Sequence, residues 1–369
     1  MKIVMLSKAL VSGAYQKKLE ALARLPAVQL TVLVPPAWHE PGVGTIWLER
    51  RFTTGYQMEV LPIALNGRHH LHFYPTLGRV LRRIRPNIFH IDEESFNLAT
   101  FLALRAGRAI GARCCFFNWA NNERIYPPPF GWFEQYAFRH AAHAIAGNHE
   151  AAHILRQHGY RGPLTVLPQF GVDPDLFAPA PATPTRDGLT VGYVGRLVAA
   201  KGVLNLVEAV ARLPDTVRLL LVGDGNLRPQ IEQRVQELDI TARVTVRPAV
   251  PSTDVPAVLQ QLDVLVLPSR TMPNWKEQFG RVLIEAMSCG VPVVGSSSGE
   301  IPNVIGDAGL VFPEGNTDAL YNGLALLMQQ PALRHALAQR GRARVLTHYT
   351  QAALAGAYYE VYQQMYHQP

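Results

Sequence analysis

The sequence has little cysteine, little charge and no long apolar run, and each shortage excludes a class of protein. Three cysteines in 369 residues, two of them adjacent at Cys114 and Cys115, cannot form a disulfide framework. There is also no Cys-x-x-Cys pair to hold zinc. No stretch reaches the roughly 18 consecutive apolar residues of a membrane-spanning helix, and residues 1–7 are too short for a secretion signal. We therefore expect a protein of the reducing cytoplasm.

The chain does have enough apolar sequence to bury large cores. Hydrophobic residues make up 48% and charged residues 17%, which excludes a disordered chain and indicates much internal surface. At roughly 150 residues per domain, the length predicts about two domains. The 35 basic residues against 28 acidic ones give a formal charge of +7, which favours anionic partners. Nucleic acid is the least favoured of these partners, because the basic residues are scattered and form no recognised module.

Short apolar segments alternate with helical patterns in both halves of the chain. This alternation predicts βαβ units and parallel sheets. We expect an α/β protein of two Rossmann-like, doubly wound domains that face a central cleft, with ligands at the carboxyl ends of the strands. The predicted strands are 2–6, 28–34, 88–91 and 113–117 in the first half, and 190–194, 217–222, 244–246, 264–267 and 291–295 in the second.

A Pro-rich stretch near the middle, residues 179–184, is the best linker candidate because it is incompatible with a helix. We place the domain boundary near it, with an N-terminal domain over 1–174 and a C-terminal domain over 175–351. The last helical stretch carries tyrosines on more than one face. We expect this helix, about 352–369, to pack back on the first domain.

Two acidic residues, Glu277 and Glu285, lie on either side of a predicted helix start near Gly280. The first then lies in the preceding loop and the second in the second turn of the helix. The amino end of such a helix offers free N–H groups and a positive dipole end to an anion. On this pair alone, an ordinary capped surface helix is the simpler interpretation.

A second group of residues, Arg196 and Lys201, follows the predicted strand 190–194. Two cations at a strand-to-helix turn suit a diphosphate, because Arg can grip it with two hydrogen bonds and Lys adds a point charge. The spacing is not that of a Walker loop. Without the acidic segment, two routine surface charges would explain it.

Taken together and in order, the motifs of the second half resemble those of glycosyltransferase family 4, the retaining enzymes of the GT-B fold. The resemblance covers the C-terminal half almost from end to end, and residues 164–177 resemble the stretch that leads into it. The motifs that carry it are Gly195-Arg196, Lys201-Gly202, Leu221 to Gly225, Glu277 to Gly280, Glu285-Ala286 and Gly290 to Val294.

The resemblance implies a role for each matching residue. Arg196 and Lys201 match the cations that neutralise the donor diphosphate and stabilise its departure. Glu277 matches the acid that touches the donor sugar, and Glu285 matches the acid that binds the ribose hydroxyls. The other residues implied to line the donor site are Gly13, Gly195, Gly223, Gln278, Phe279 and Gly280. No cofactor and no metal ligand are implied.

The chemistry of the proposed reaction suits these residue types. A leaving nucleoside diphosphate gains negative charge while the sugar becomes oxocarbenium-like, and fixed cations and helix N–H groups stabilise that charge. The resemblance implies retention through attack on one face, with a phosphate oxygen accepting the proton of the acceptor. A nucleophilic Glu277 is an alternative, but a binding role is favoured.

We therefore expect a hexosyltransferase that uses a nucleotide-diphosphate sugar, with UDP favoured over GDP. The acceptor would be a hydroxyl of a sugar, a lipid-linked glycan or a small molecule, in cell-envelope, polysaccharide or glycoside synthesis. The main departure from the family is Asn118, which stands where many relatives have a histidine and cannot act as a base; a smaller one is Ser12-Gly13, where the family often has two glycines. Two alternatives stay open, namely a nucleotide-sugar-binding protein without transferase activity and a sugar-nucleotide 2-epimerase.

Weaker signals have simpler explanations. Asp173 and Asp175 are expected to cap a turn rather than bind metal, and the histidines at 69, 70 and 72 lack helical metal-ligand spacing.

The basic amphipathic helix 77–85 is expected to pack on its own domain. Contact with an anionic membrane at its inner face is the alternative. Segment 92–94 either reaches the cleft or is a solvated acidic loop, and the aromatic loop 126–132 either contacts an acceptor or packs between domains.

Overall fold

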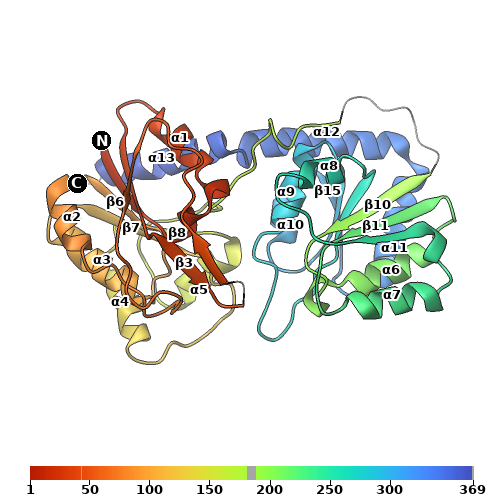
Figure 1. Cartoon of the computed structure of the whole chain (residues 1–369), viewed down its shortest axis with the longest axis horizontal. Helices are drawn as coiled ribbons and strands as arrows, with labels where there is room; N and C mark the ends of the chain where they lie inside the picture. Colours follow the sequence, from red (N-terminus) through yellow and green to blue (C-terminus); the bar gives the residue numbers. More distant parts are fainter. Residues whose placement is uncertain (43, 181–187, 368–369) are drawn as a thin grey trace. The chain divides into compact units, whose positions relative to one another are not determined.

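The computed structural model describes residues 1–42, 44–180 and 188–367, and the chain divides into two units (Figure 1). Unit 1 comprises Met1–Gly171 together with the chain from Gln351 on, and unit 2 comprises Val172–Thr350. Residues before the Pro-rich stretch already belong to unit 2, because Phe177 is buried in its core and its carbonyl oxygen accepts a hydrogen bond from Ser288 Oγ at 2.8 Å. The chain therefore enters unit 2 ahead of the predicted linker, of which residues 181–184 lie outside the described residues.

Unit 1 is built on a seven-stranded parallel sheet of order β5-β2-β1-β6-β7-β8-β9. Its strands alternate between two apolar faces, and each face packs on its own group of helices. A small antiparallel hairpin of β3 (Ala37–Glu40) and β4 (Gly44–Trp47) stands beside the sheet. The bounds of the sheet strands are β1 (Lys2–Leu6), β2 (Gln29–Val34), β5 (Gln57–Val60), β6 (Ile88–Ile91), β7 (Arg113–Asn118), β8 (His143–Ala146) and β9 (Leu164–Val166).

The helices of unit 1 cover both faces of this sheet. One face packs on α2, α3, α4 and α5, and the other packs on α1 and α13. Their bounds are α1 (Lys17–Ala23), α2 (Leu77–Ile84), α3 (Leu98–Arg108), α4 (Phe130–His140), α5 (His149–Gln157) and α13 (Gln351–His367).

Unit 2 repeats this architecture with a six-stranded parallel sheet of order β12-β11-β10-β13-β14-β15. A single apolar core joins the sheet to its helices. The strands are β10 (Leu189–Val194), β11 (Val217–Val222), β12 (Val244–Arg247), β13 (Val264–Leu267), β14 (Val293–Ser296) and β15 (Gly309–Phe312). The helices are α6 (Val203–Ala211), α7 (Arg228–Glu237), α8 (Val255–Leu259), α9 (Arg281–Ser288), α10 (Ile301–Ile305), α11 (Thr317–Gln329) and α12 (Pro331–His348).

The strands predicted from the sequence are present, with small shifts at their ends. The strand predicted over 291–295 begins two residues later, as β14, at Val293. Val291 instead donates its N–H to Ala286 O at the end of α9, and Pro292 has no N–H to donate to the sheet. The α/β fold with two parallel sheets is therefore confirmed.

The C-terminal helix α13 lies on unit 1 beside α1 (Figure 1). It buries Tyr358 and Tyr362 against the sheet, while Tyr366 is about half exposed. Tyr362 forms a 2.6 Å hydrogen bond with Nδ1 of His90 on β6, and the Lys18 ammonium lies 4.3 Å from the centre of the Tyr358 ring. The helix thus completes the second apolar face of unit 1.

Helix α2 packs its apolar side on unit 1. Leu77, Val80 and Leu81 are buried, while Arg82 and Arg83 are exposed. Its apolar face is therefore used inside the unit. Among residues 1–42, 44–180 and 188–367, no helix is long and apolar enough to cross a bilayer.

Candidate functional site

The predicted donor residues of unit 2 lie in the loops that follow its central strands. Gly195 follows β10, Gly223 follows β11, and Ser269 follows β13. Because β10 pairs in parallel with both β11 and β13, the carboxyl ends of these strands meet at one edge of the sheet. The structure thus gathers segments 195–201, 223–225 and 268–280 from distant parts of the chain.

The centre of this edge is an ion pair between Lys201 and Glu277. Lys201 Nζ lies 2.5 Å from Glu277 Oε2, and Ser269 Oγ donates to the same oxygen at 2.8 Å. Glu277 is only 7% exposed, so both contacts are made in a partly desolvated setting. The Lys201 ammonium also lies 4.9 Å from the centre of the Trp275 ring. Two residues predicted as neighbours in the site are thereby in direct contact.

The loops hold this ion pair through close backbone approaches at glycines. Gly202 has φ +64°, and a Cβ added there would lie 2.0 Å from the Pro268 carbonyl oxygen. A Cβ at Gly223 would lie 1.8 Å from the carbonyl oxygen of Gly195. Only glycine allows the strand-end loops to approach each other this closely.

Helix α9 begins at Arg281, directly after Gly280, as the sequence predicts. Glu285 lies in its second turn, is buried, and accepts a hydrogen bond from Arg281 Nε at 2.8 Å. Burial raises the pKa of the Glu285 carboxyl, and Arg281 opposes this shift. One oxygen of the Glu285 carboxyl is therefore held by the Arg281 guanidinium. The amino end of the helix directly follows the loop that carries Glu277.

Arg196 is exposed, and among the described residues its guanidinium makes no hydrogen bond or ion pair. Its backbone is fixed, because Tyr193 Oη donates to the Arg196 carbonyl oxygen at 2.7 Å. Burial raises the pKa of Tyr193, so this hydroxyl keeps its proton. Of the two remaining predicted residues of unit 2, Gln278 is exposed, and Phe279 is half-buried with its ring 5.7 Å from that of Tyr349.

Gly13 is the one predicted donor residue in unit 1. It starts a short 3₁₀ turn after β1, and its N–H donates to Glu49 Oε2 at 2.8 Å. The amide that the resemblance assigns to a diphosphate is thus paired with a carboxylate of its own unit.

The acidic segment after β6 is buried, so the solvated interpretation of residues 92–94 is wrong. Glu93 forms an ion pair with Lys8 and contacts Nε2 of His72 at 3.2 Å. Burial alone would raise the pKa of Glu93, but Lys8 and His72 lower it to about 2. Sequence reasoning missed both partners, because neither carries a motif that points to Glu93.

Glu94 differs from its neighbour in having one oxygen without a partner. Trp119 donates its N–H to Glu94 Oε1 at 3.0 Å, whereas Oε2 is buried and has no hydrogen-bond partner among the described residues. Burial raises the pKa of this carboxyl to about 7. Phe96 and Tyr126 stack nearby in unit 1 with ring centres 3.9 Å apart. A buried carboxylate oxygen without a hydrogen bond is rare in folded proteins, and it marks this loop as a place where a function is expected.

Asn118, the residue that departs from the family pattern, supports the same loop. It ends β7, is 3% exposed, and its Oδ1 accepts the Ser95 N–H at 2.8 Å. This contact orders the turn that carries Glu94.

The aspartates and two of the histidines among the weaker signals have hydrogen-bond partners within the protein. Asp173 Oδ1 accepts the Asp175 N–H at 3.2 Å, which is a turn cap. His70 contacts Asn97, and His72 contacts Glu93. Within the described parts of the chain, no group of three His, Cys, Asp or Glu residues could hold a metal ion.

Two protein-family models match overlapping parts of the chain. The model of Glycosyltransferase Family 4 matches residues 19–195, and the model of Glycosyl transferases group 1 matches residues 180–344. Together they span both units and all of the predicted donor residues of unit 2.

Curated relatives include two proteins of Streptomyces kanamyceticus. A 2-deoxystreptamine glucosyltransferase is 31% identical over 258 residues, which is 64% of this chain and 65% of that protein. An alpha-D-kanosaminyltransferase is 29% identical over 259 residues, which is 65% of this chain and 66% of that protein. The matched part of the chain thus spans slightly less than two thirds of either relative.

Among solved structures, Anabaena HepE in complex with UDP superposes with a TM-score of 0.71 at 19% identity, covering 99% of this chain and 100% of that chain. At this identity the likeness shows the shared fold, which is that of two-domain GT-B glycosyltransferases.

The close approach at Gly202 predicts a large loss of stability in Gly202→Ala. The matched control is Gly290→Ala, because Gly290 also has a positive φ (+72°) but an added Cβ there would lie 3.7 Å from Pro179, an ordinary contact. Both variants should lose about 1–2 kcal/mol from the left-handed backbone. Gly202→Ala should lose roughly 1–3 kcal/mol more from overpacking, as measured by urea unfolding. Equal losses in the two variants would contradict the close packing of the Lys201 loop.

Proposed function

Because the chain belongs to the glycosyltransferases of family 4 and group 1, we propose that it transfers a hexose, with retention, from a nucleotide-diphosphate sugar to a hydroxyl acceptor. The observation that carries the proposal is the Lys201–Glu277 ion pair at the strand ends of unit 2, with Arg196 exposed in the loop that leads from β10 to Lys201. A buried carboxylate, a fixed ammonium and an uncommitted guanidinium form a site for a sugar attached to an anion.

In this proposal, Arg196 and Lys201 bind the diphosphate. The guanidinium of Arg196 can bind two phosphate oxygens at once. The ammonium of Lys201 has three hydrogens, so it can keep Glu277 and donate to a phosphate oxygen as well. Both cations stabilise the charge that grows on the leaving diphosphate. They supply the positive charge for this step, so we propose a metal-independent reaction.

Glu277 is proposed to bind the donor sugar rather than attack it. Its Oε2 is occupied by Lys201 and Ser269, and a carboxylate that accepts two hydrogen bonds is a weak nucleophile. The proton of the acceptor would then pass to a phosphate oxygen of the leaving group. Attack and departure on one face of the sugar account for retention.

Glu285 is proposed to bind the ribose. A carboxylate can accept from two neighbouring hydroxyls, and Arg281 helps to keep it ionised despite its burial. We propose UDP as the nucleotide, ahead of GDP. The UDP complex of the HepE structure supports this order, although that protein shares only 19% identity with the chain.

We propose that the acceptor binds to unit 1 at the loops after β6 and β7. The Glu94 carboxyl, whose Oε2 has no partner among the described residues, would turn toward an acceptor hydroxyl, and the partly exposed Tyr126 ring, which stacks on the buried Phe96, offers an aromatic surface to a sugar ring. Glu93 is less suited to this role, because Lys8 and His72 already neutralise it.

We place the protein in the cytoplasm, where nucleotide sugars are made. Contact with the inner face of an anionic membrane would have to use the exposed arginines of α2 alone, because the apolar side of this helix is buried in unit 1. Such a contact would be electrostatic and sensitive to salt.

Two other activities are distinguishable from transfer. A nucleotide-sugar-binding protein would bind the donor without turnover over a panel of hydroxyl acceptors. A sugar-nucleotide 2-epimerase would isomerise the donor with no acceptor present. Asn118 in place of a histidine motivates the first of these, but its hydrogen bond to Ser95 gives it a structural role that does not depend on transfer.

Nucleotide binding is tested first, with UDP, GDP and ADP in a thermal-shift and calorimetry screen. UDP should raise the melting temperature most, since a ligand of the folded state stabilises it by mass action. Glu285→Ala should weaken UDP binding about tenfold or more through loss of charge-assisted hydrogen bonds. Glu232→Ala, an exposed acid on α7, is the control. Unchanged UDP affinity in Glu285→Ala would refute the ribose role.

The two cations are tested by turnover. Arg196→Ala and Lys201→Ala should each lower kcat by on the order of 10²–10³, the usual cost of removing one group that stabilises the leaving charge. Arg234→Ala on the exposed face of α7 should leave kcat unchanged. Circular dichroism verifies that each variant is folded. Wild-type kcat in either cation variant would argue against diphosphate departure at this site.

The acceptor role of Glu94 has a pH signature. Its pKa of about 7 means that protonation below this pH removes the charge that binds the acceptor hydroxyl. The KM for the acceptor should therefore rise as the pH falls through 7. Glu94→Gln should raise KM about tenfold and remove this pH dependence, while the Kd for UDP stays unchanged. The control is Glu123→Gln, which changes an exposed acid of the same domain. If KM in Glu94→Gln depended on pH as in the wild type, the acceptor role of Glu94 would be contradicted.

A further inference from the structure

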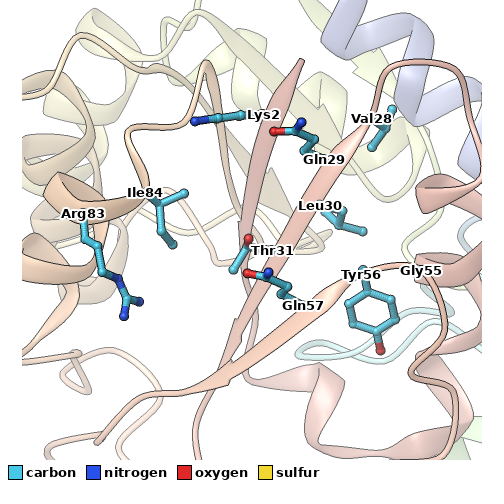
Figure 2. Close-up of a pocket in the computed structure, with 10 residues that line it drawn as sticks. All are labelled: Lys2, Val28, Gln29, Leu30, Thr31, Gly55, Tyr56, Gln57, Arg83 and Ile84. Atoms are coloured by element: carbon cyan, nitrogen blue, oxygen red, sulfur yellow. The ribbon is translucent and has the colours of Figure 1, made fainter.

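Unit 1 has a hollow at the amino ends of its strands, away from the strand ends that carry the proposed acceptor loops. Its volume is about 660 Å³. Figure 2 shows that β1, β2, the start of β5 and the end of α2 contribute to it. The lining residues are Lys2, Val28, Gln29, Leu30, Thr31, Gly55, Tyr56, Gln57, Arg83 and Ile84.

The register of the sheet places four polar side chains on one face of these strands. Lys2 pairs with Gln29, and Thr31 pairs with Gln57. Directly paired residues project to the same side, and Gln29 and Thr31 are two positions apart on β2, so all four share that side. Arg83 and Ile84 come from α2, which covers the same face further along the strands (Figure 2).

The same face is apolar where α2 and α3 cover it. Val4, Leu6 and Leu33 continue the rows of Lys2 and Thr31 at positions two apart, and they are buried in the core with those helices. The change from apolar to polar side chains coincides with the end of α2. The hollow is therefore the polar part of the same sheet face, at the strand ends that α2 does not cover.

The polar side chains of the hollow lack protein partners. Among the described residues, the side chains of Lys2, Gln29, Thr31 and Gln57 make no hydrogen bond or ion pair. Thr31 is only 9% exposed, so its hydroxyl lies at the recessed floor. A flat bilayer surface cannot reach such a floor, whereas a small molecule can. Lys2, Gln29 and Gln57 are exposed, so their side chains are open to a ligand from solvent, and only Thr31 is recessed.

The charge around the hollow is positive. Lys2 and Arg83 line it, and its described lining contains no Asp or Glu. Glu59 binds Arg83 from outside the lining, but the exposed Arg79 and Arg82 add to the positive side of α2. Such a field attracts anions. Two amides and a hydroxyl add the donors and acceptors that polyhydroxylated ligands use.

We propose that this hollow is a second small-molecule site, which binds a saccharide carrying a phosphate or carboxylate group. Lys2 and Arg83 bind the anionic group, and Gln29, Thr31 and Gln57 bind hydroxyls. The site is separate from the proposed donor site, because all of its residues belong to unit 1 and the donor cations belong to unit 2.

The test is calorimetric titration of the full chain with glucose 6-phosphate, glucuronate, glucose and inorganic phosphate. At least one of the two anionic sugars should bind more tightly than both glucose and phosphate. Arg83→Ala and Gln57→Ala should each weaken that binding about tenfold, the loss expected for one charge-assisted or polar hydrogen-bonding group. Arg79→Ala is the matched control, since it removes an exposed arginine of the same helix that does not line the hollow.

Two further arms separate this site from the donor site and from a membrane. Saturating UDP, or the Lys201→Ala substitution, should leave the affinity for the anionic sugar unchanged. Competition by UDP, equal weakening in Arg79→Ala and Arg83→Ala, or no binding of either sugar would overturn the proposal. Binding to vesicles of phosphatidylglycerol without binding of the free sugars would overturn it as well. None of these outcomes depends on whether the chain has transferase activity.

Discussion

Every strand of the two main sheets runs parallel to its neighbours, and the positions of the functional side chains follow from this constraint. In a parallel sheet all the strand-to-helix loops gather at one edge. Lys201 and Glu277 are 76 positions apart in the chain, yet they share a hydrogen bond because β10 and β13 are neighbours. The same constraint brings Lys8, after β1, to Glu93, after β6.

The acidic residues at these edges are in different electrostatic states. Glu277 and Glu93 are each paired with a lysine, and Glu285 is paired with an arginine. Glu94 has only backbone support, and one of its oxygens is left without a partner. Lys8 and His72 lower the pKa of Glu93 to about 2 and keep it charged, whereas burial without a cation raises the pKa of Glu94 to about 7 and leaves it able to change its protonation near neutral pH. In this loop, Glu93 can therefore contribute to stability while its neighbour Glu94 stays available for a ligand.

The alternation of apolar and helical segments was enough to predict nine of the strands and the start of α9 after Gly280, because these depend on local pattern and on a backbone turn. It missed six strands of three or four residues each, namely β3, β4, β5, β8, β9 and β15. The pairing of Lys201 with Glu277 could be expected only from the family resemblance, since no local signal reports strand order. The ion pair of Glu93 with Lys8 and the contact between Gly13 and Glu49 were not predicted. Both depend on which loops meet in space. The hollow beside α2 also escaped prediction, because it arises where a helix ends over a sheet and not from any motif.

The return of α13 to unit 1 has a consequence for biosynthesis. A ribosome makes unit 1 through Gly171 and then all of unit 2 before it reaches the helix that covers one face of the first sheet. Until then, the side of β1 and β6 that later receives Tyr358 and Tyr362 is open to water or to other chains. The second apolar face of unit 1 is thus completed only after the segment that forms unit 2 has been made.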